Sequence, residues 1–527
     1  MNKMKKVLSV ILTAIMVLAM SIPTFAASKG SDNIYGTRDD TGTITIKGID
    51  EETGIEVKAY PIIEAVYGDN GSFSGYKSLY TVKGITKNQV VNSDVTLSAA
   101  QLTEYANQVT GTSYTMTKGS NGNYVAEVPV GAYIVLVTKT EAHSYNPMVV
   151  SVTYTNNNGS TDITDGNLDI TDGEAVAKKS DAPEVDKKIT NANKDANAND
   201  KGHSVNIGDD VNYEVSVKPI PNYTGAYPVL NVVDTLSTGL TYNNDLVVKI
   251  DETILTKNED YTVEFDNAKN EITVNFVVGG KYTLNAYQGK AAVITYSAEL
   301  NTDAALNNSA NKNDVTLNYT KDSKTTGNDD DDNSKTYTYT FDIDGATTGT
   351  TGIITKTGVE NEIETALNGA EFGLYTSKAD AKNNTYPVDT QTSKKEGGVD
   401  GQLHFTGLKA GTYYLKEISA PAPYTVNNNI YTVVITAEYY TEANADQGID
   451  KGMLKKWTVT IDDNEVASFE ATHDWSKTGD GTTIKNTKIS SLPSTGGIGT
   501  TIFTIGGCAI MIVAAGLFFA TRRKTQK

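Results

Sequence analysis

The stretch EVDKKI, residues Glu184–Ile189, alternates apolar and charged residues as a half-buried β-strand does. Successive side chains of a strand point to opposite faces of the sheet, so Val185, Lys187 and Ile189 share one face. Its two apolar members predict that this face is buried. The stretch therefore predicts a strand that carries Lys187 into a core and leaves Lys188 outside.

A charged lysine on a buried face costs free energy unless another group pairs with it or forms a hydrogen bond to it. The same alternation finds two candidate partners in later strands. Asp234 lies on the apolar face of residues 232–236, and Asn313 lies on the apolar face of residues 313–319. The sequence thus predicts that a lysine, a carboxyl group and an amide meet in one core.

A second set of the same three residue types follows nearer the C-terminus. Each member shares a strand face with the apolar residue two positions before it, and the members are Lys356, Glu417 and Asn486. Finding the pattern twice favours a built arrangement over coincidence. The plainer alternative for each set is a buried, hydrogen-bonded ion pair with no further chemistry.

Short alternating runs bounded by turn residues recur along the chain and predict an all-β fold. They lie at residues 43–46, 211–217, 272–278, 315–319, 337–343 and 457–461. Their spacing indicates tandem immunoglobulin-like β-sandwiches. The 30 tyrosines and the abundant threonine and valine agree with strands. Apart from the chain ends, only residues 97–109 are predicted to be helical, with Ser98 as a possible cap.

Polar linkers near residues 175–183 and 345–352 divide the chain into three modules. The predicted domains are residues 27–177, 178–344 and 345–490. Each is long enough to bury a core of its own.

Both ends of the 527-residue chain look like targeting segments. Residues 1–26 have lysines, an apolar stretch and small residues before a cleavage site, as a signal peptide does. Residues 498–520 form an apolar run long enough to cross a bilayer as a helix, and the basic tail 521–527 is expected to stay in the cytoplasm. The single cysteine, Cys508, lies in that run, so the exported domains are expected to lack disulfides.

The pentapeptide Leu492-Pro493-Ser494-Thr495-Gly496 stands just before the apolar run. Pro493 biases Leu492 toward the extended shape that a protease-like cleft can read. The order of pentapeptide, apolar run and basic end resembles the LPXTG substrates of sortases in Gram-positive bacteria. This resemblance implies that an enzyme cysteine cleaves between Thr495 and Gly496 and passes the threonine carbonyl to an amine. The alternative is an ordinary C-terminal anchor with a coincidental pentapeptide.

The two lysine sets lie in stretches that resemble pilin domains. Residues 183–319, with Asp234–Leu240 inside them, resemble the fimbrial isopeptide-forming domain. Residues 353–486, with residues 367–375 and 413–417 inside them, resemble a Cna B-type domain. The resemblance implies Cna-type sandwiches and intramolecular isopeptide bonds, with these assignments: Lys187 to Asn313, Lys356 to Asn486, and Asp234 and Glu417 as the promoting acids.

Burial would shift the pKa values of these groups in the direction that the formation of the bonds requires. Desolvation lowers the pKa of a lysine and raises that of a carboxyl group, so a neutral amine can attack an amide whose carbonyl the protonated acid polarises. Ammonia leaves and a cross-link remains. For the loop from Lys187 to Asn313, the chain-entropy model gives a stabilisation of roughly 4 to 5 kcal/mol. No such bond is predicted in the first module, where Ile44 and Ile46 define the core face and Lys47 points out.

The segment Val176-Ala177-Lys178-Lys179 precedes the second module, where pilus backbones carry the lysine that joins subunits. It resembles the pilin motif tyrosine-proline-lysine-asparagine, with Val176-Ala177 in place of tyrosine-proline. Lys178 matches the nucleophile, and Lys179 is the alternative. On the local sequence alone, the two lysines also fit a plain solvated linker.

As a whole, the chain resembles the major, or backbone, pilin of Gram-positive sortase-assembled pili. The resemblance implies a secreted, cell wall-anchored shaft subunit with a role in adhesion. The implied partners are pilin-specific and housekeeping sortases, other copies of the chain, ancillary pilins and peptidoglycan. The alternative is a monomeric wall-anchored adhesin or an ancillary pilin, in which neither lysine is consumed.

Other functions fit the sequence poorly. The net charge of -19 argues against nucleic acid. The four histidines lack metal-ligand spacing, and no nucleophile elbow or phosphate loop is present, so neither a cofactor nor a turnover enzyme is expected. The acidic run Asp329–Asp332 lacks the spacing of a calcium loop and is predicted to be a solvated loop, with metal binding left open.

Overall fold

The computed structural model describes residues 36–488, with gaps, and residues 499–524. The gaps are residues 70, 72, 92–96, 98, 141, 157–167, 193–197, 224–227, 322–329, 344–351 and 474. The predicted signal peptide, the candidate cap Ser98 and the pentapeptide Leu492–Gly496 lie outside the described residues. The chain forms two compact units, Met1–Thr340 with Tyr439–Leu454, and Phe341–Glu438 with Lys455–Lys527.

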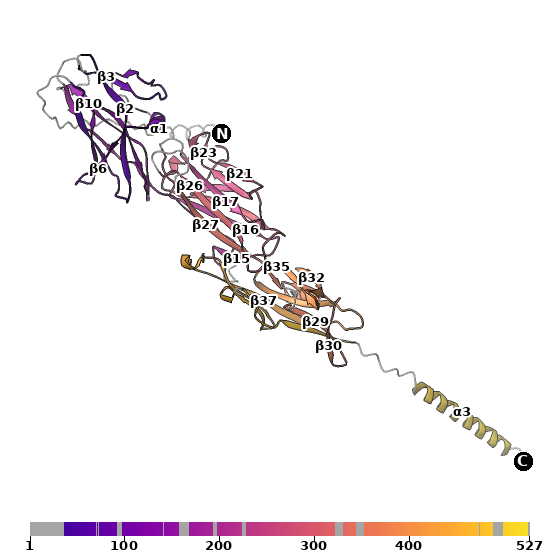
Figure 1. Ribbon diagram of the computed structural model, residues 1–527. Coiled ribbons are helices and arrows are strands. Elements are labelled where there is room, and N and C mark those ends of the chain that lie inside the picture. Colours follow the sequence, from indigo (N-terminus) through magenta and orange to yellow (C-terminus); the bar gives the residue numbers. More distant parts are fainter. Residues whose placement is uncertain are drawn as a thin grey trace, which may run out of the picture. The chain divides into compact units, whose positions relative to one another are not determined.

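The N-terminal part of the first unit consists of two packed sheets (Figure 1). One has the order β12-β1-β7-β6, with bounds Gly173–Val176, Thr41–Lys47, Tyr124–Pro129 and Thr117–Lys118. The other has the order β11-β10-β8-β2-β3-β4, with bounds Leu168–Thr171, Met148–Asn156, Gly131–Thr138, Glu56–Tyr67, Phe73–Ser78 and Val90–Val91. The short β5, Tyr114–Thr115, pairs with β2, and β9, His143–Tyr145, pairs with β13, Lys179–Asp181.

The predicted helix forms as α1, Ala99–Gln108, and confirms that expectation. Tyr105 on α1 and Val109 just after it are fully buried, in a small core with Ile134 and Leu136 of β8. The alternate residues of β8, such as Val135, face the other sheet instead. Strand β8 is therefore apolar almost throughout because both of its faces are covered.

The rest of the first unit is mainly a second pair of sheets, each with six strands (Figure 1). One has the path β14-β16-β25-β19-β20 with β18 beside β25, and the bounds are Glu184–Ile189, Asp210–Lys218, Ala292–Leu300, Val247–Ile250, Thr253–Ile254 and Leu240–Tyr242. The other has the order β15-β27-β26-β17-β22-β21, with bounds Gly202–Ser204, Asp330–Tyr339, Asn311–Tyr319, Leu230–Leu236, Glu271–Asn275 and Thr262–Asp266. Smaller elements are β23, Val277–Val278, β24, Lys281–Tyr282, and the 3₁₀ turns Asn285–Tyr287 and Ala445–Gln447.

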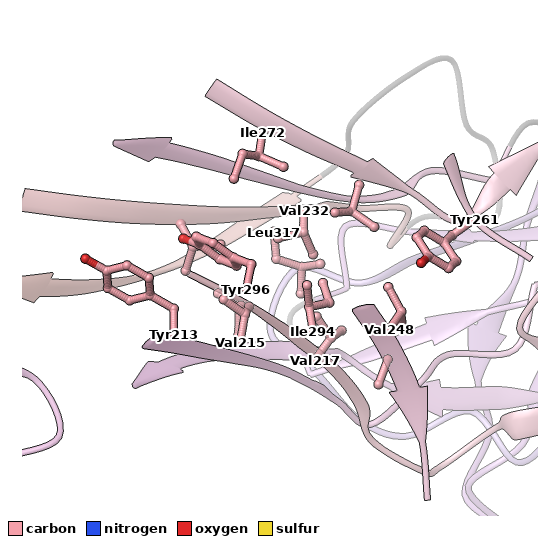
Figure 2. Close-up of a cluster of buried hydrophobic side chains, with 14 of the residues drawn as sticks. Tyr213, Val215, Val217, Val232, Val248, Tyr261, Ile272, Ile294, Tyr296 and Leu317 are labelled. Carbon is pink, nitrogen blue, oxygen red and sulfur yellow. The ribbon is translucent and has the colours of Figure 1, made fainter. Parts of the chain in front are cut away.

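The side chains of one core fill the space between these two sheets (Figure 2). Val215 of β16 and Ile294 of β25 come from one sheet, and Val232 of β17 and Leu317 of β26 come from the other. All four are no more than 2% exposed. The predicted alternation is confirmed, since β26 reads buried at every second residue from Asn311 to Tyr319.

The second unit contains two further sheets, with order β30-β29-β34-β33 plus β40 beside β29, and β32-β31-β36-β37-β38-β39. The bounds of the first are Ile363–Ala366, Ile354–Glu360, Val399–Leu403, Lys394–Glu396 and Thr482–Thr487. Those of the second are Asp389–Thr392, Glu371–Tyr375, Gly411–Ser419, Ile430–Tyr439, Leu454–Ile461 and Asn464–Glu470. A separate pair joins β28, Phe341–Ile343, to β35, Phe405–Leu408. The Trp457 ring stacks on Phe341 and Phe469 in the core.

Two local expectations were wrong. The second unit has a short helix, α2, Lys378–Asn383, whose N-cap Ser377 accepts a hydrogen bond from the Asp380 amide. Asp330–Asp332 do not form a loop but begin β27, because pairing with β26 and the bond from the Val185 amide to the Asp332 carboxylate hold them extended. Asp329 lies outside the described residues.

The C-terminal helix α3 spans Gly499–Lys524 and exposes large apolar side chains such as Ile512 and Phe519. No helix among the described residues is both long enough and apolar enough to cross a bilayer. The membrane-spanning run at residues 498–520 stays a prediction.

The second unit also contains a histidine held between two carboxylates. His404 Nδ1 lies 3.0 Å from Glu396 Oε1, and Nε2 lies 3.6 Å from Asp342 Oδ2. Asp342 first, and Glu396 after it, raise the pKa of His404 from 6.5 to about 9, against the opposing effect of burial. Protonation of His404 therefore stabilises the fold fully below about pH 6.5, and this contribution is lost as the pH rises through about 9.

We expect the thermal midpoint of this unit to fall between pH 6 and pH 10 by more in the wild type than in His404→Gln. The variant lacks the group whose proton is lost, so its midpoint should change less over that range. Scanning calorimetry at both pH values on both proteins measures the difference. Equal decreases in the two proteins would show that His404 does not contribute in this way.

Candidate functional site

The first predicted set of three residues comes together between the two six-stranded sheets. Lys187 lies on β14 of one sheet, and Asp234 and Asn313 lie on the adjacent strands β17 and β26 of the other. The register places Asn313 opposite Leu236, two residues from Asp234 on the same face. Lys187 and Asn313 are 0% exposed and Asp234 is 3% exposed, which confirms the predicted buried faces.

The Lys187 amine is held by a carboxylate and a phenol. Lys187 Nζ donates to Asp234 Oδ1 at 2.5 Å, to Asp234 Oδ2 at 2.6 Å, and to the Tyr296 hydroxyl at 2.7 Å. Tyr296 donates to Asp234 Oδ2 at 2.7 Å. Asn313 enters the network through its Nδ2, which donates to the same hydroxyl at 2.7 Å.

Sequence reasoning missed the aromatic part of this site. Tyr213 on β16 and Tyr296 on β25 pair across the sheet, and Lys187 Nζ lies 5.0 Å and 5.2 Å from their ring centroids. Both tyrosines are buried. Both lie on the apolar face of an alternating strand, so the parity rule that found Lys187 could have found them. Nothing in the sequence distinguishes them from ordinary core tyrosines.

Burial lowers the pKa of Lys187 from 10.5 to about 8, although the nearby Asp234 acts to raise it. A charged amine loses its hydration in this core, and the desolvation outweighs the ion pair. A neutral amine is a nucleophile, whereas an ammonium group is not. The site therefore brings an amine that deprotonates more easily than usual close to an amide.

The second predicted set comes together in the second unit. Lys356 lies on β29, Glu417 on β36 and Asn486 on β40. Parallel pairing of β29 with β40 puts Lys356 opposite Ile484 and Gly358 opposite Asn486. All three members of the set are no more than 1% exposed.

The contacts of this second set differ from those of the first. Lys356 Nζ lies 4.0 Å from Glu417 Oε1 and donates to the backbone carbonyls of Thr357 and Ile484 at 3.0 Å and 2.9 Å. Asn486 Nδ2 donates directly to Glu417 Oε1 at 2.7 Å. Burial lowers the pKa of Lys356 from 10.5 to about 8, with Glu417 opposing the shift.

In both sets the asparagine nitrogen, and not its carbonyl oxygen, faces the acid or the phenol. Among the described residues, Asn313 Oδ1 and Asn486 Oδ1 are buried without a hydrogen-bond partner. A buried acceptor without a partner is costly. The geometry differs from the expectation that the acid bonds the carbonyl. In the second set the Glu417 carboxylate accepts from Asn486 Nδ2, because a carboxylate can accept a hydrogen bond but not donate one. In the first set the Asn313 amide donates to the Tyr296 hydroxyl instead.

The two candidate linking lysines differ in their surroundings. Both are exposed. Lys179 pairs with Tyr145 of β9 in the strand register, and its amine forms an ion pair with Asp50. Lys178 precedes β13, and its backbone carbonyl accepts from the Asn146 amide at 3.0 Å. Within the described part of the chain, the Lys178 amine forms no ion pair, which leaves it the more available of the two.

In the first module, Lys47 points outward as the sequence predicts. The Lys47 side chain is 43% exposed and forms an ion pair with Glu174 on the adjacent β12. Ile44 and Ile46 are fully buried on the opposite face of β1. Lys47 therefore does not take part in a buried set of the kind found in the other two modules.

Three family models match separate regions of the chain. Residues 207–324 match the Gram-positive pilin backbone subunit 2, Cna-B-like domain. Residues 350–449 match the SpaA prealbumin-like fold domain, and residues 484–527 match the LPXTG cell wall anchor motif.

Proteins similar to this chain include pilins of Streptococcus and of Corynebacterium. The trypsin-resistant surface T6 protein of Streptococcus pyogenes is 28% identical over 93% of this chain and 96% of its own length. The solved structure of the T6 backbone pilin covers 86% of this chain and all of that one, at 22% identity and a TM-score of 0.51. The major pilin SpaD of Corynebacterium diphtheriae covers 86% of this chain and 98% of its own, at 18% identity and a TM-score of 0.46. The three matched regions show that the chain contains a pilin backbone Cna-B-like domain, a prealbumin-like fold domain and an LPXTG cell wall anchor motif, and the near full-length similarity shows that it is homologous to the T6 backbone pilin.

Proposed function

We propose that the chain is the shaft subunit of a covalently polymerised surface pilus and that two internal isopeptide bonds stabilise each subunit. The bonds would join Lys187 to Asn313 and Lys356 to Asn486. The observation that carries this proposal is the pair of buried sets, each of which holds a lysine amine, a carboxyl group and an asparagine amide in one core.

Each bond would form by one condensation. The neutral lysine Nζ attacks the asparagine Cγ, a new C–N bond forms, and the bond from Cγ to Nδ2 breaks. One proton passes from Nζ to Nδ2, which leaves as ammonia. The lowered lysine pKa values of about 8 support this step, because they make the neutral amine more available near neutral pH. Asp234 and Glu417 would transfer the proton.

These reactions would occur once, within the chain itself. Backbone pilins are structural proteins, and the two acids would be left buried beside their own product with no path for a second substrate. We therefore propose no turnover activity and no cofactor for this chain.

Subunits would be joined through Thr495 at the C-terminal end of the exported region and through Lys178, which lies between the first and second modules. A sortase cysteine would cleave between Thr495 and Gly496 and hold the Thr495 carbonyl as a thioester, which the Lys178 amine of another copy would attack. Exposure of Lys178 and the ion pair of Lys179 with Asp50 favour Lys178. Because the donor and the acceptor are different surfaces, each joining step leaves a new free end and the fibre stays open.

Several partners follow from this scheme. A pilin-specific sortase would carry out polymerisation, and a housekeeping sortase would transfer the finished fibre to peptidoglycan. Ancillary pilins would attach to the shaft by the same acyl transfer. The chain is a cell wall-anchored surface protein by its LPXTG motif.

The first test is the intact mass of the secreted chain produced without any sortase. We expect the measured mass of the wild type to be lower than the mass calculated from its sequence by two ammonias, about 17 Da for each condensation. After correction for the substitution itself, Asn313→Ala and Asn486→Ala should each restore one ammonia, and each lost cross-link should cost roughly 4 to 5 kcal/mol of stability.

Asn318→Ala is the matched control for this test. Asn318 lies on β26 like Asn313, but on its other face, where it donates to Asn231. The control should keep both ammonia losses. If the wild type has the full mass calculated from its sequence, both sets are only buried ion pairs and the proposed bonds are contradicted.

The second test is polymerisation of Lys178→Ala with a pilin-specific sortase, followed on a denaturing gel. We expect the wild type and Lys179→Ala to form a covalent ladder and Lys178→Ala to remain a single band, because no other amine would be placed to attack the thioester. A ladder lost only in Lys179→Ala would assign the linkage to Lys179. A wild type that is cleaved but never forms a ladder would favour a monomeric adhesin or an ancillary pilin.

A further inference from the structure

The Tyr296 hydroxyl lies at the centre of the first buried set. It accepts from Lys187 Nζ and from Asn313 Nδ2, and it donates to Asp234 Oδ2, with all three distances at 2.7 Å. It is therefore in hydrogen-bond contact with the nucleophile, the acid and the leaving nitrogen at once. Tyr296 belongs to β25, and its side chain is 3% exposed.

The acid of this set does not contact the amide directly. Within the described residues, Asp234 bonds Lys187 and Tyr296, and no hydrogen bond joins it to Asn313. In the second set, Glu417 Oε1 accepts from Asn486 Nδ2 at 2.7 Å without an intermediary. The acid and the amide are thus in direct contact in the second set but not in the first. Proton transfer between the acid and the leaving group of the first set therefore needs a bridging group.

We propose that the Tyr296 hydroxyl is that bridge, a proton relay that carries the proton from Asp234 to the leaving nitrogen of Asn313 as the Lys187–Asn313 bond forms. This inference rests on the proposed function. It assigns a catalytic role to Tyr296, whereas among the described residues no tyrosine hydroxyl is hydrogen-bonded to a member of the second set.

The protons balance along this route. Transfer from the ammonium group to the carboxylate first gives a neutral amine and a protonated Asp234. When Nζ attacks Cγ, Asp234 Oδ1 takes a proton from Nζ while Oδ2 gives one to the Tyr296 oxygen. Tyr296 passes its own proton to Nδ2, the bond from Cγ to Nδ2 breaks, and ammonia leaves. Asp234 and Tyr296 end in the protonation states in which they began the attack.

A phenol suits this role in this place. Burial, and then the charge of Asp234, raise the pKa of Tyr296 well above its ordinary value, so the hydroxyl keeps a proton at every step before transfer. Tyrosine carries one rotating O–H bond that donates while the oxygen still accepts. The hydroxyl can therefore accept from Asn313 before the attack and donate to the same nitrogen afterwards.

Tyr296→Phe tests the relay, because it removes the hydroxyl and keeps the ring. The full chain is purified without sortase, its intact mass is followed over days, and protease peptides identify which bond has formed. General acid–base groups contribute about 100-fold or more to rate. We expect the Lys187–Asn313 bond to form at least about 100-fold more slowly, while the Lys356–Asn486 bond forms as in the wild type.

Tyr242→Phe is the matched control. The Tyr242 ring packs edge-on against the Tyr296 ring at 5.8 Å, but its hydroxyl accepts from the Leu246 amide, away from the reacting groups. This variant should form both bonds at the wild-type rate.

Amide hydrogen exchange in β16 and β25 separates a relay from a merely structural role. Asn313→Ala, which lacks the bond but keeps the hydroxyl, is the reference. If Tyr296→Phe lacks the bond and its exchange protection equals that of Asn313→Ala, the hydroxyl acts in the reaction. Protection below that reference, or a bond formed at the wild-type rate, would overturn the relay. A wild type without the Lys187–Asn313 bond would instead refute the proposed cross-link on which the relay depends.

Discussion

One energetic constraint dominates the second module: the Lys187 amine is buried between two sheets, and burial of a charged group costs free energy. A charge removed from water is stable there only with close partners, and Asp234 and Tyr296 supply them at 2.5 to 2.7 Å. Such a pair contributes little net stability, because desolvation offsets the attraction. Under the proposed function its value would lie in reactivity, since the same desolvation brings the pKa of Lys187 down to about 8. The proposed bond would then remove the buried charge permanently.

If both proposed bonds form, the two buried sets would carry out one reaction in two sandwiches with different contacts. In the first, the acid grips the amine and reaches the amide only through a phenol. In the second, the acid accepts a hydrogen bond directly from the amide, and the amine donates to two backbone carbonyls and lies 4.0 Å from the acid. What the sets share is burial of all three polar groups and asparagine carbonyl oxygens without a partner. The two sets therefore have burial and proximity in common, and not one fixed hydrogen-bond pattern.

The sequence predicted the buried faces because a strand with one apolar face has little freedom of register. That rule placed Lys187 and Asn313 correctly. It could not single out Tyr296, since a tyrosine on a buried face looks like ordinary core until its hydroxyl partners are known. The helix α2 was too short for a periodic signal, although Ser377 at its N-cap and Asn384 at its C-cap are residues typical of helix ends. The acidic run ending at Asp332 was misjudged from composition, because pairing with β26 is not visible in composition.

Parallel pairing of β29 with β40 has a mechanical consequence. These strands are the first and the last, in chain order, of the sheet that carries Lys356 and Asn486, and they run in the same direction, so tension on the two chain ends would shear them along their shared edge. Their backbone hydrogen bonds would bear that load together. A covalent tie from Lys356 to Asn486 would span this edge and carry the tension instead. The strands between the two residues would then be a slack loop, and the module would transmit a pulling force without lengthening.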